Sequence, residues 1–176
     1  MIALRCWRPA DADDLVACCN DPQLAYWLDN LPVPYTTVHA HTYITLSLQA
    51  WQGGGVETAF AITDTVTAAV LGSCGVFWQD EDAGVAEIGY WVRRDVRGRG
   101  IASRAVTLAA GWVFATVGWE RLELRVDTRN TASQRVAEKA GFDREGVLRS
   151  AAINTADQTR VDLALYALVR SDLAAS

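Results

Sequence analysis

Residues 85–117 combine an alternating strand, a turn rich in arginine and glycine, and a helix, and this unit constrains the fold more than any other segment. The turn gathers Arg93, Arg94, Arg97 and Arg99 with two glycines in a chain whose formal net charge is -5. Because side chains alternate along a strand, its residues divide between two faces. One face holds Ala86, Ile88, Tyr90 and Val92, and the other holds Glu87, Gly89 and Trp91. The unit therefore predicts an α/β fold with the helix packed on a sheet.

Further strand and helix patterns lie on both sides of this unit. Runs rich in β-branched and aromatic residues predict strands over residues 2–8, 56–63, 68–78, 85–92, 119–127, 142–149 and 159–169. Helices are predicted over residues 11–19, 22–27, 37–51, 101–117 and 130–140. The expected N-caps are Thr37 and Asn130, and the expected stops are the glycines at 53–55 and Gly141. The apolar face of the helix over 101–117 is expected to hold Ile101, Ala105, Leu108 and Trp112. This order predicts one mixed sheet with helices packed on it, in a single domain over residues 1–176.

Composition limits the class of protein. Hydrophobic residues make up 51% of the chain and charged residues 21%, which is an ordinary soluble balance. No apolar run reaches the roughly 18 residues of a membrane span, and the N-terminus lacks the apolar core of a signal peptide. A cytoplasmic protein without a membrane partner is therefore expected, and the acidic balance argues against nucleic acid as the main partner.

Cysteines and histidines give no sign of a metal site. The four cysteines form no C-x-x-C pair, and they are expected as reduced, mostly buried thiols. The two histidines, His39 and His41, lie two positions apart and point in different directions on a helix. Neither a zinc site nor a histidine-based triad is predicted.

The turn before the helix has the features of an anion site. The first amides of a helix lack internal partners and carry partial positive charge, and glycines let the backbone approach a ligand closely. A P-loop is excluded because Gly100 is followed by Ile101, and a dinucleotide fingerprint because Ser103 stands where its last glycine belongs. The pattern predicts a phosphate or pyrophosphate site. The alternative is a solvated turn whose arginines serve solubility.

The segment Arg97-Gly98-Arg99-Gly100-Ile101-Ala102 resembles the Arg/Gln-x-x-Gly-x-Gly/Ala signature of the GNAT superfamily of acyl-CoA-dependent acetyltransferases. Residues 87–92 look like the strand that precedes this loop in the superfamily. Residues 4–14, 130–133 and 138–142 are similar to its ribosomal-protein N-terminal acetyltransferase (Rim) branch. The resemblance covers nearly the whole chain, although residues 21–55 carry no motif. It implies a mainly antiparallel twisted sheet of six to seven strands with a central splay, flanked by about four helices.

The resemblance also implies acetyl-CoA as cofactor and a set of residues that bind it. The loop amides hold the pyrophosphate, and the strand before the loop pairs with the pantetheine arm. An amide near Tyr90 or Trp91 polarises the thioester carbonyl, and Gly89 either marks a close backbone approach or merely avoids a clash. The implied binding residues are Tyr90, Trp91, Val92, Arg97, Gly98, Arg99, Gly100, Ile101, Ala102, Ser103, Asn130 and Ser133.

Two residues are catalytic candidates under this resemblance. Ser133 is the candidate proton donor to the leaving thiolate, because no tyrosine stands in the matching region; the alternative is helix capping together with Asn130. Glu87 is the candidate base, or it only orients the amine, and its alternative role is an ion pair with an arginine. An α-amine has a pKa of about 7.7–8.0, so a strong base is unnecessary.

The acceptor is expected against residues 27–51 and the turn over 79–84, where Trp27, Asp29, Tyr35, Tyr43, Trp51, Asp80, Glu81 and Asp82 lie. Three functions stay open. The first is acetylation of a protein or peptide N-terminus, the second acetylation of a small-molecule amine, and the third non-catalytic acyl-CoA sensing. Succinyl-CoA is an alternative donor, and a homodimer is expected from the resemblance.

Overall fold

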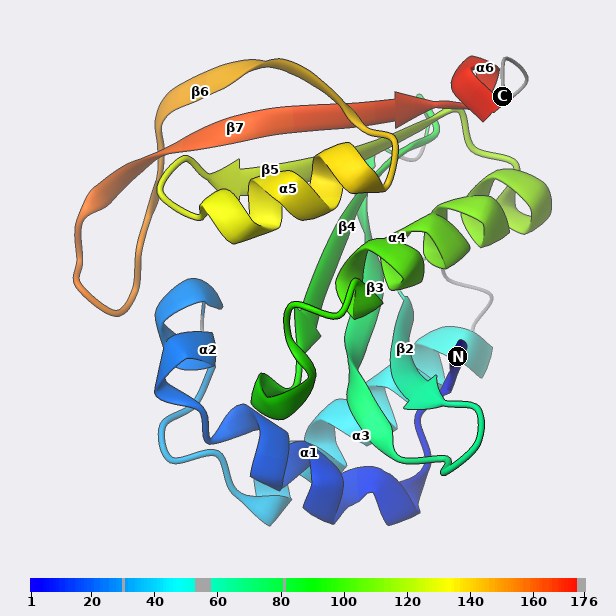
Figure 1. The fold of residues 1–176 in the computed structure, drawn as a ribbon, viewed down its shortest axis with the longest axis vertical. Coiled ribbons are helices and arrows are strands. Elements are labelled where there is room, and N and C mark those ends of the chain that lie inside the picture. The colour runs from blue at the N-terminus through cyan, green and yellow to red at the C-terminus, as the bar shows by residue number, and fades with distance from the viewer. Residues whose placement is uncertain (30, 53–57, 81, 174–176) are drawn as a thin grey trace.

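Seven strands form one sheet in the computed structural model, which describes residues 1–29, 31–52, 58–80 and 82–173 (Figure 1). The strands are β1 (Ile2–Cys6), β2 (Thr58–Asp64), β3 (Val70–Asp80), β4 (Val85–Val92), β5 (Arg121–Asp127), β6 (Asp143–Ile153) and β7 (Arg160–Val169). Their spatial order is β1-β2-β3-β4-β5-β7-β6. Every neighbouring pair is antiparallel except β4 and β5, which run parallel. This arrangement confirms the predicted mixed, mainly antiparallel sheet.

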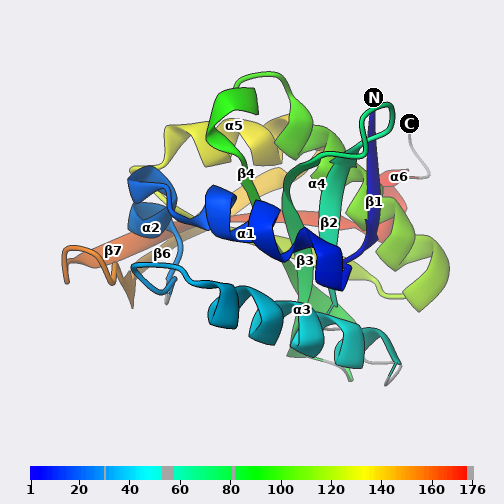
Figure 2. The same ribbon diagram turned by 90° about the horizontal axis from the view of Figure 1, so that it is seen from below.

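Helices cover both faces of the sheet. They are α1 (Ala12–Cys19), α2 (Pro22–Trp27), α3 (Thr37–Gln52), α4 (Ile101–Trp112), α5 (Thr131–Lys139) and α6 (Arg170–Leu173). Figure 2 shows α3 and α4 on opposite sides of the strands. One apolar core lies between the sheet and α4 with α5, and a second lies between the other face and α1 with α3. None of the helices in the described part of the chain is long and apolar enough to cross a membrane.

The predicted caps are confirmed at one helix and shifted at another. The side-chain oxygen of Asn130 accepts a hydrogen bond of 3.0 Å from the Ser133 amide, and Gly141 ends α5 with a φ of 89°. Thr37 is wrong as a cap by one residue. Because the amide of Ala40 donates to the carbonyl of Thr36, the helix already begins at Thr37. The predicted stop at 53–55 and the predicted strand start at Val56 lie outside the described residues.

The buried stripe of α4 differs from the predicted one at Leu108. This side chain is 47% exposed, whereas Ile101, Ala105 and Ala109 are buried against the sheet. Small side chains at the contact let the helix lie close to the strands, which rotates the buried stripe away from the larger leucine. After Trp112 the helix continues as a π-helical turn over Val113–Val117.

Candidate active site

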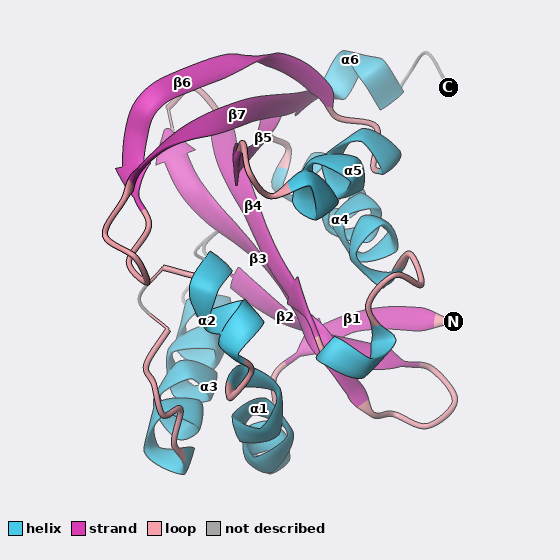
Figure 3. Cartoon of the chain, turned by 60° about the vertical axis from the view of Figure 1, so that its left-hand side comes forward, coloured by secondary structure: helices cyan, strands magenta, loops and turns pink. Residues whose placement is uncertain are grey.

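Strands β4 and β5 separate after three residue pairs. Val85, Ala86 and Glu87 pair with Arg121, Leu122 and Glu123, respectively. Beyond Glu87, no further pair joins the two strands in the described chain, and Figure 3 shows them diverging. The central splay expected for the fold is therefore present, and one edge of β4 is open from Ile88 to Val92.

Backbone geometry shows which groups of β4 face this gap. The amide of Arg93 donates a hydrogen bond of 2.8 Å to the carbonyl of Leu71 on β3. Hydrogen-bonding groups alternate in direction along a strand, so the amides of Val92 and Tyr90 point to the opposite, open edge. The amide of Trp91 points to β3, and its side chain packs in the core under α1 and α3.

The loop before α4 presents a row of backbone amides at a helix N-terminus. Gly98 and Gly100 have φ angles of 76° and 72°, which residues other than glycine rarely adopt. The first helical hydrogen bond runs from the amide of Arg104 to the carbonyl of Gly100, so the amides of residues 101–103 precede the helical ladder. Ser103 donates its hydroxyl to the same carbonyl at 3.1 Å, which leaves its amide for a ligand. This geometry fits an anion such as pyrophosphate.

The side chains of Arg97 and Arg99 in this loop form hydrogen bonds with other groups of the protein. Arg97 donates to the carbonyl of Val92, to the side-chain oxygen of Gln23 and to the carboxylate of Asp21, the last at 2.5 Å. Arg99 donates to the carbonyl of Asp95. Arg97 therefore connects the loop to the start of α2. No local pattern in the sequence predicts this contact.

Tyr90 and Ser133 connect β4 to α5 through their hydroxyl groups. The two oxygens lie 2.7 Å apart, and either can donate. Burial raises the pKa of Tyr90 to about 12, although the bond to Ser133 acts in the opposite direction, so the phenol keeps its proton at neutral pH. A tyrosine from β4 thus reaches the predicted proton donor, although the segment that contains Ser133 has no tyrosine of its own.

Glu87 lies at the last paired position of β4, with its side chain 27% exposed. Burial raises the pKa of this carboxyl; Arg125 lowers it, Glu123 raises it, and the net direction is upward. The Nε atom of Arg125 lies 3.7 Å from Oε2 of Glu87. This ion pair is the alternative role expected for Glu87, but it is too long for a strong hydrogen bond. A raised pKa makes the Glu87 carboxylate a stronger base for an amine proton.

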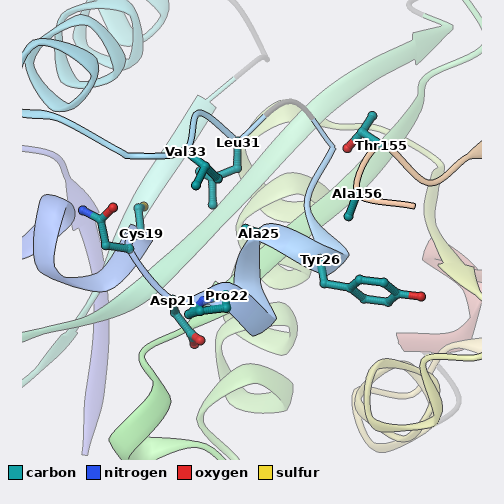
Figure 4. Close-up of a pocket in the computed structure, with 10 residues that line it drawn as sticks. Cys19, Asp21, Pro22, Ala25, Tyr26, Leu31, Val33, Thr155 and Ala156 are labelled. Atoms are coloured by element: carbon teal, nitrogen blue, oxygen red, sulfur yellow. The ribbon is translucent and has the colours of Figure 1, made fainter. Parts of the chain in front are cut away.

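Two adjoining cavities lie on the acceptor side of the molecule, and Glu87 is among the lining residues of neither. The larger, of about 490 Å³, is lined by α1, α3, the loop residues 28–29 and 31–35, and the strands β3 and β4. The smaller, of about 470 Å³, lies between α2, the same loop and the turn after β6 (Figure 4). Cys19 and Leu31 line both cavities. The side-chain amide of Asn154 donates to the carbonyl of Tyr26 and so holds the β6–β7 turn beside α2.

The structure brings together only part of the predicted acceptor zone. Asp29, Tyr35 and Tyr43 line the larger cavity. Trp51 instead packs against Phe60 and Trp112 at the far end of α3. Of the predicted acidic turn, Glu81 lies outside the described residues, and the two flanking aspartates are exposed and line neither cavity.

Comparisons with known proteins agree with this geometry. Residues 2–143 match the family described as acetyltransferase (GNAT) domain. The chain is 28% identical to the uncharacterized N-acetyltransferase p20 of Bacillus licheniformis, over 98% of this chain and 95% of that protein. Its fold is similar to that of the microcin C7 self immunity acetyltransferase MccE, solved with acetyl-CoA and AMP, with a TM-score of 0.84 and 22% identity over 96% of this chain and 92% of that chain. It is also similar to the ribosomal-protein-S5-alanine acetyltransferase from Vibrio fischeri, with a TM-score of 0.82 and 19% identity over 97% and 94% of the two chains. The chain therefore belongs to the GNAT acetyltransferase family and is an acyl-CoA-dependent N-acetyltransferase that uses acetyl-CoA.

Proposed function

We propose that residues 1–176 act as one domain that transfers an acetyl group to the α-amine of a protein or peptide N-terminus. The observation that carries this choice is the pair of adjoining cavities, which extends from β4 to the β6–β7 turn and offers room for a chain. A polyamine or aminoglycoside would favour a pit with several carboxylates. The described lining residues supply Asp29 and Asp21, and Asp21 is engaged by Arg97. The homodimer and the cytoplasmic location stay predictions.

We assign the cofactor to the open edge of β4 and the loop after it. Acetyl-CoA supplies an acetyl group activated as a thioester. The amides of residues 98–103 would hold its pyrophosphate, and a Cβ placed on Gly98 would meet no atom within 4 Å, so the loop backbone is accessible there. The amide of Val92 would pair with the pantetheine arm. The helix cap uses the oxygen of Asn130 and not its NH2 group, which stays available for the same arm.

The chemical roles follow from the two sides of β4. Glu87 accepts the proton that the α-ammonium loses, and the neutral amine forms the new N–C bond while the C–S bond breaks. The amide of Tyr90 donates to the carbonyl oxygen on which negative charge develops. Ser133 gives its proton to the departing sulfur, and the acylated nitrogen gives its surplus proton to solvent, from which Ser133 is reprotonated. The hydroxyl of Tyr90 lies 2.7 Å from the serine oxygen and supports it.

The test is release of thiol from acetyl-CoA with N-terminal peptides, polyamines, aminoglycosides and free amino acids. We expect release with peptides, and none with the same peptides acetylated at the N-terminus. Ser133→Ala should lower kcat about 10²-fold, in the range of a lost general acid. Thr131→Ala, an exposed change in the same helical turn, should leave it unchanged. No release from any amine, with coenzyme A still binding in calorimetry, would contradict the proposal and favour a sensor or another acyl donor.

A further inference from the structure

The larger cavity has a predominantly apolar wall beside the candidate base. Its large apolar side chains include Leu15, Leu28, Leu31, Pro32, Leu46 and Phe77. They come from α1, α3, the loop residues 28, 31 and 32, and β3, so apolar side chains line the space from several elements. An ammonium group loses hydration without compensation in such surroundings, whereas an apolar group gains by leaving water.

Core packing does not explain Phe77, nor Leu46 of α3, which is 60% exposed and also lies outside both cores of the described residues. The Phe77 side chain is 44% exposed and lies outside both apolar cores formed by the described residues. Its ring occupies the space above two glycines. A Cβ on Gly75 would lie 2.8 Å from Cζ of the ring, and a Cβ on Gly89 would lie 3.0 Å from Cε2. Gly89 thus makes room for this ring, which is the clash-avoiding role considered for it from the sequence.

Phe77 also stands directly beside the candidate base. Phe77 and Glu87 are partners in the β3–β4 ladder. Directly opposite residues project on the same face with Cβ atoms about 5 Å apart. An α-amine and its side chain branch from one carbon, so a side chain lying against the Phe77 ring leaves its amine near Glu87.

Charge on the cavity wall favours a single amine. Of the described lining residues, Asp29 is the one carboxylate, and His39 the one imidazole. The ring nitrogen Nδ1 of His39 already accepts a hydrogen bond from the Thr36 amide. A substrate with several ammonium groups would find too few partners here.

Resting on the proposed function, we infer that this cavity selects acceptors whose primary amine is next to a large apolar side chain, with Phe77 as the specificity-determining residue. The acceptor class is an N-terminal phenylalanine, leucine or similar residue rather than alanine, serine or a polyamine. Discrimination comes from apolar area, since one methylene in an apolar pocket changes kcat/KM by about 10-fold or more.

The test compares peptides that differ only in their first residue. With acetyl-CoA, we expect kcat/KM for the N-terminal phenylalanine peptide to exceed that for the alanine peptide by at least about 10-fold. Phe77→Ala should reduce that ratio to near one, while Phe77→Leu should retain most of it. Val147→Ala, a 41% exposed apolar residue on β6, is the matched control and should leave the ratio unchanged. Circular dichroism of each variant checks that it folds.

The outcomes separate this inference from the proposed function. Equal kcat/KM for both peptides, or an unchanged ratio in folded Phe77→Ala, overturns the inference while acetylation of peptides stands. Higher kcat/KM for spermidine than for any peptide overturns both. If no amine reacts but the phenylalanine peptide binds in calorimetry and Phe77→Ala weakens it about 10-fold, the apolar site stands without the proposed function.

Discussion

Replacing Asp21 by asparagine tests the clamp that joins α2 to the loop before α4. The Asp21 side chain caps α2 by accepting from the Gln23 amide and also accepts from Arg97. Asparagine is an equally good N-cap, so Asp21→Asn keeps the cap, while its NH2 group replaces the oxygen that accepts from Arg97 and removes both the charge and that hydrogen bond. The side chains of Asp21 and Arg97 are 8% and 28% exposed. An exposed pair contributes about 1 kcal/mol or less, and a broken buried pair costs about 3–5 kcal/mol. This intermediate pair is expected to contribute about 2 kcal/mol.

A loss of about 2 kcal/mol should lower the Tm of a chain of this size by roughly 4–8 °C. The assay is thermal and urea unfolding of Asp21→Asn, Arg97→Gln and the double variant. The two single losses should overlap, because both variants remove the same contact. Asp13→Asn, at an exposed position of α1, is the control and should change stability by less than about 0.5 kcal/mol. Strict additivity of the two clamp variants, or an Asp21→Asn as stable as the control, would refute the reasoning.

The same variant should separate binding from chemistry. Arg97 belongs to the loop assigned to the cofactor, and Asp21 lines the smaller cavity. Asp21→Asn should therefore raise KM for acetyl-CoA and for the acceptor by a few fold. Its kcat should stay nearly unchanged, because Ser133 and Glu87 keep their partners. A large fall in kcat at constant KM would contradict a clamp.

Three further outcomes are expected. The wild-type kcat/KM should fall as pH drops through the raised pKa of Glu87, and Glu87→Gln should lower kcat/KM by about 10²-fold and abolish that acid limb of the pH–rate profile. Burial raises the pKa of Asp11, but the hydrogen bonds from Arg5 and from the Arg8 amide outweigh burial, so the net pKa is lowered. The charged Asp11 therefore stabilises the fold above the ordinary carboxyl pKa, and this stabilisation is lost as pH falls through the pKa of the folded state. Urea titrations from pH 7 to pH 3 should show that Asp11→Asn costs about 2–3 kcal/mol at neutral pH and flattens this acid dependence. Gly98→Ala should raise KM for acetyl-CoA and destabilise by about 1 kcal/mol because of its positive φ, whereas Gly146→Ala, equally open but without a positive φ, should change KM little.

Local patterns predicted the parts of the fold that depend on neighbouring residues. Alternation in β4 assigned Ile88 and Trp91 to opposite faces, and the structure buries them in the two separate cores. The Asn130 cap follows from the spacing of a polar residue before a helical pattern, and it forms as predicted. The prediction that Leu108 is buried was wrong because a helical repeat shows which residues share a face. It does not show which of these residues turns toward the sheet.

Contacts between distant segments had no such signal. Asp21 and Arg97 are 76 positions apart, and Tyr90 and Ser133 are 43 apart. Each pair depends on where the sheet places two elements, and no periodicity in either element encodes the partner. Phe77 was likewise invisible as a site residue, because an aromatic residue in a strand usually belongs to the core.

The geometry of β4 explains why this one short strand predicted so many features of the candidate active site. A strand has two edges and two faces, and each direction of β4 meets a different part of the site. One edge bonds β3, and the other is open beyond Glu87; one face turns Tyr90 toward α5, and the other turns Gly89 toward the acceptor-side cavities. Backbone geometry alone sets this alternation, so the sequence could assign a direction to each residue before any partner was known. For the same reason, substitutions on one face should leave the contacts of the other face in place, whereas a one-residue insertion in β4 would exchange the faces and dismantle all of them together.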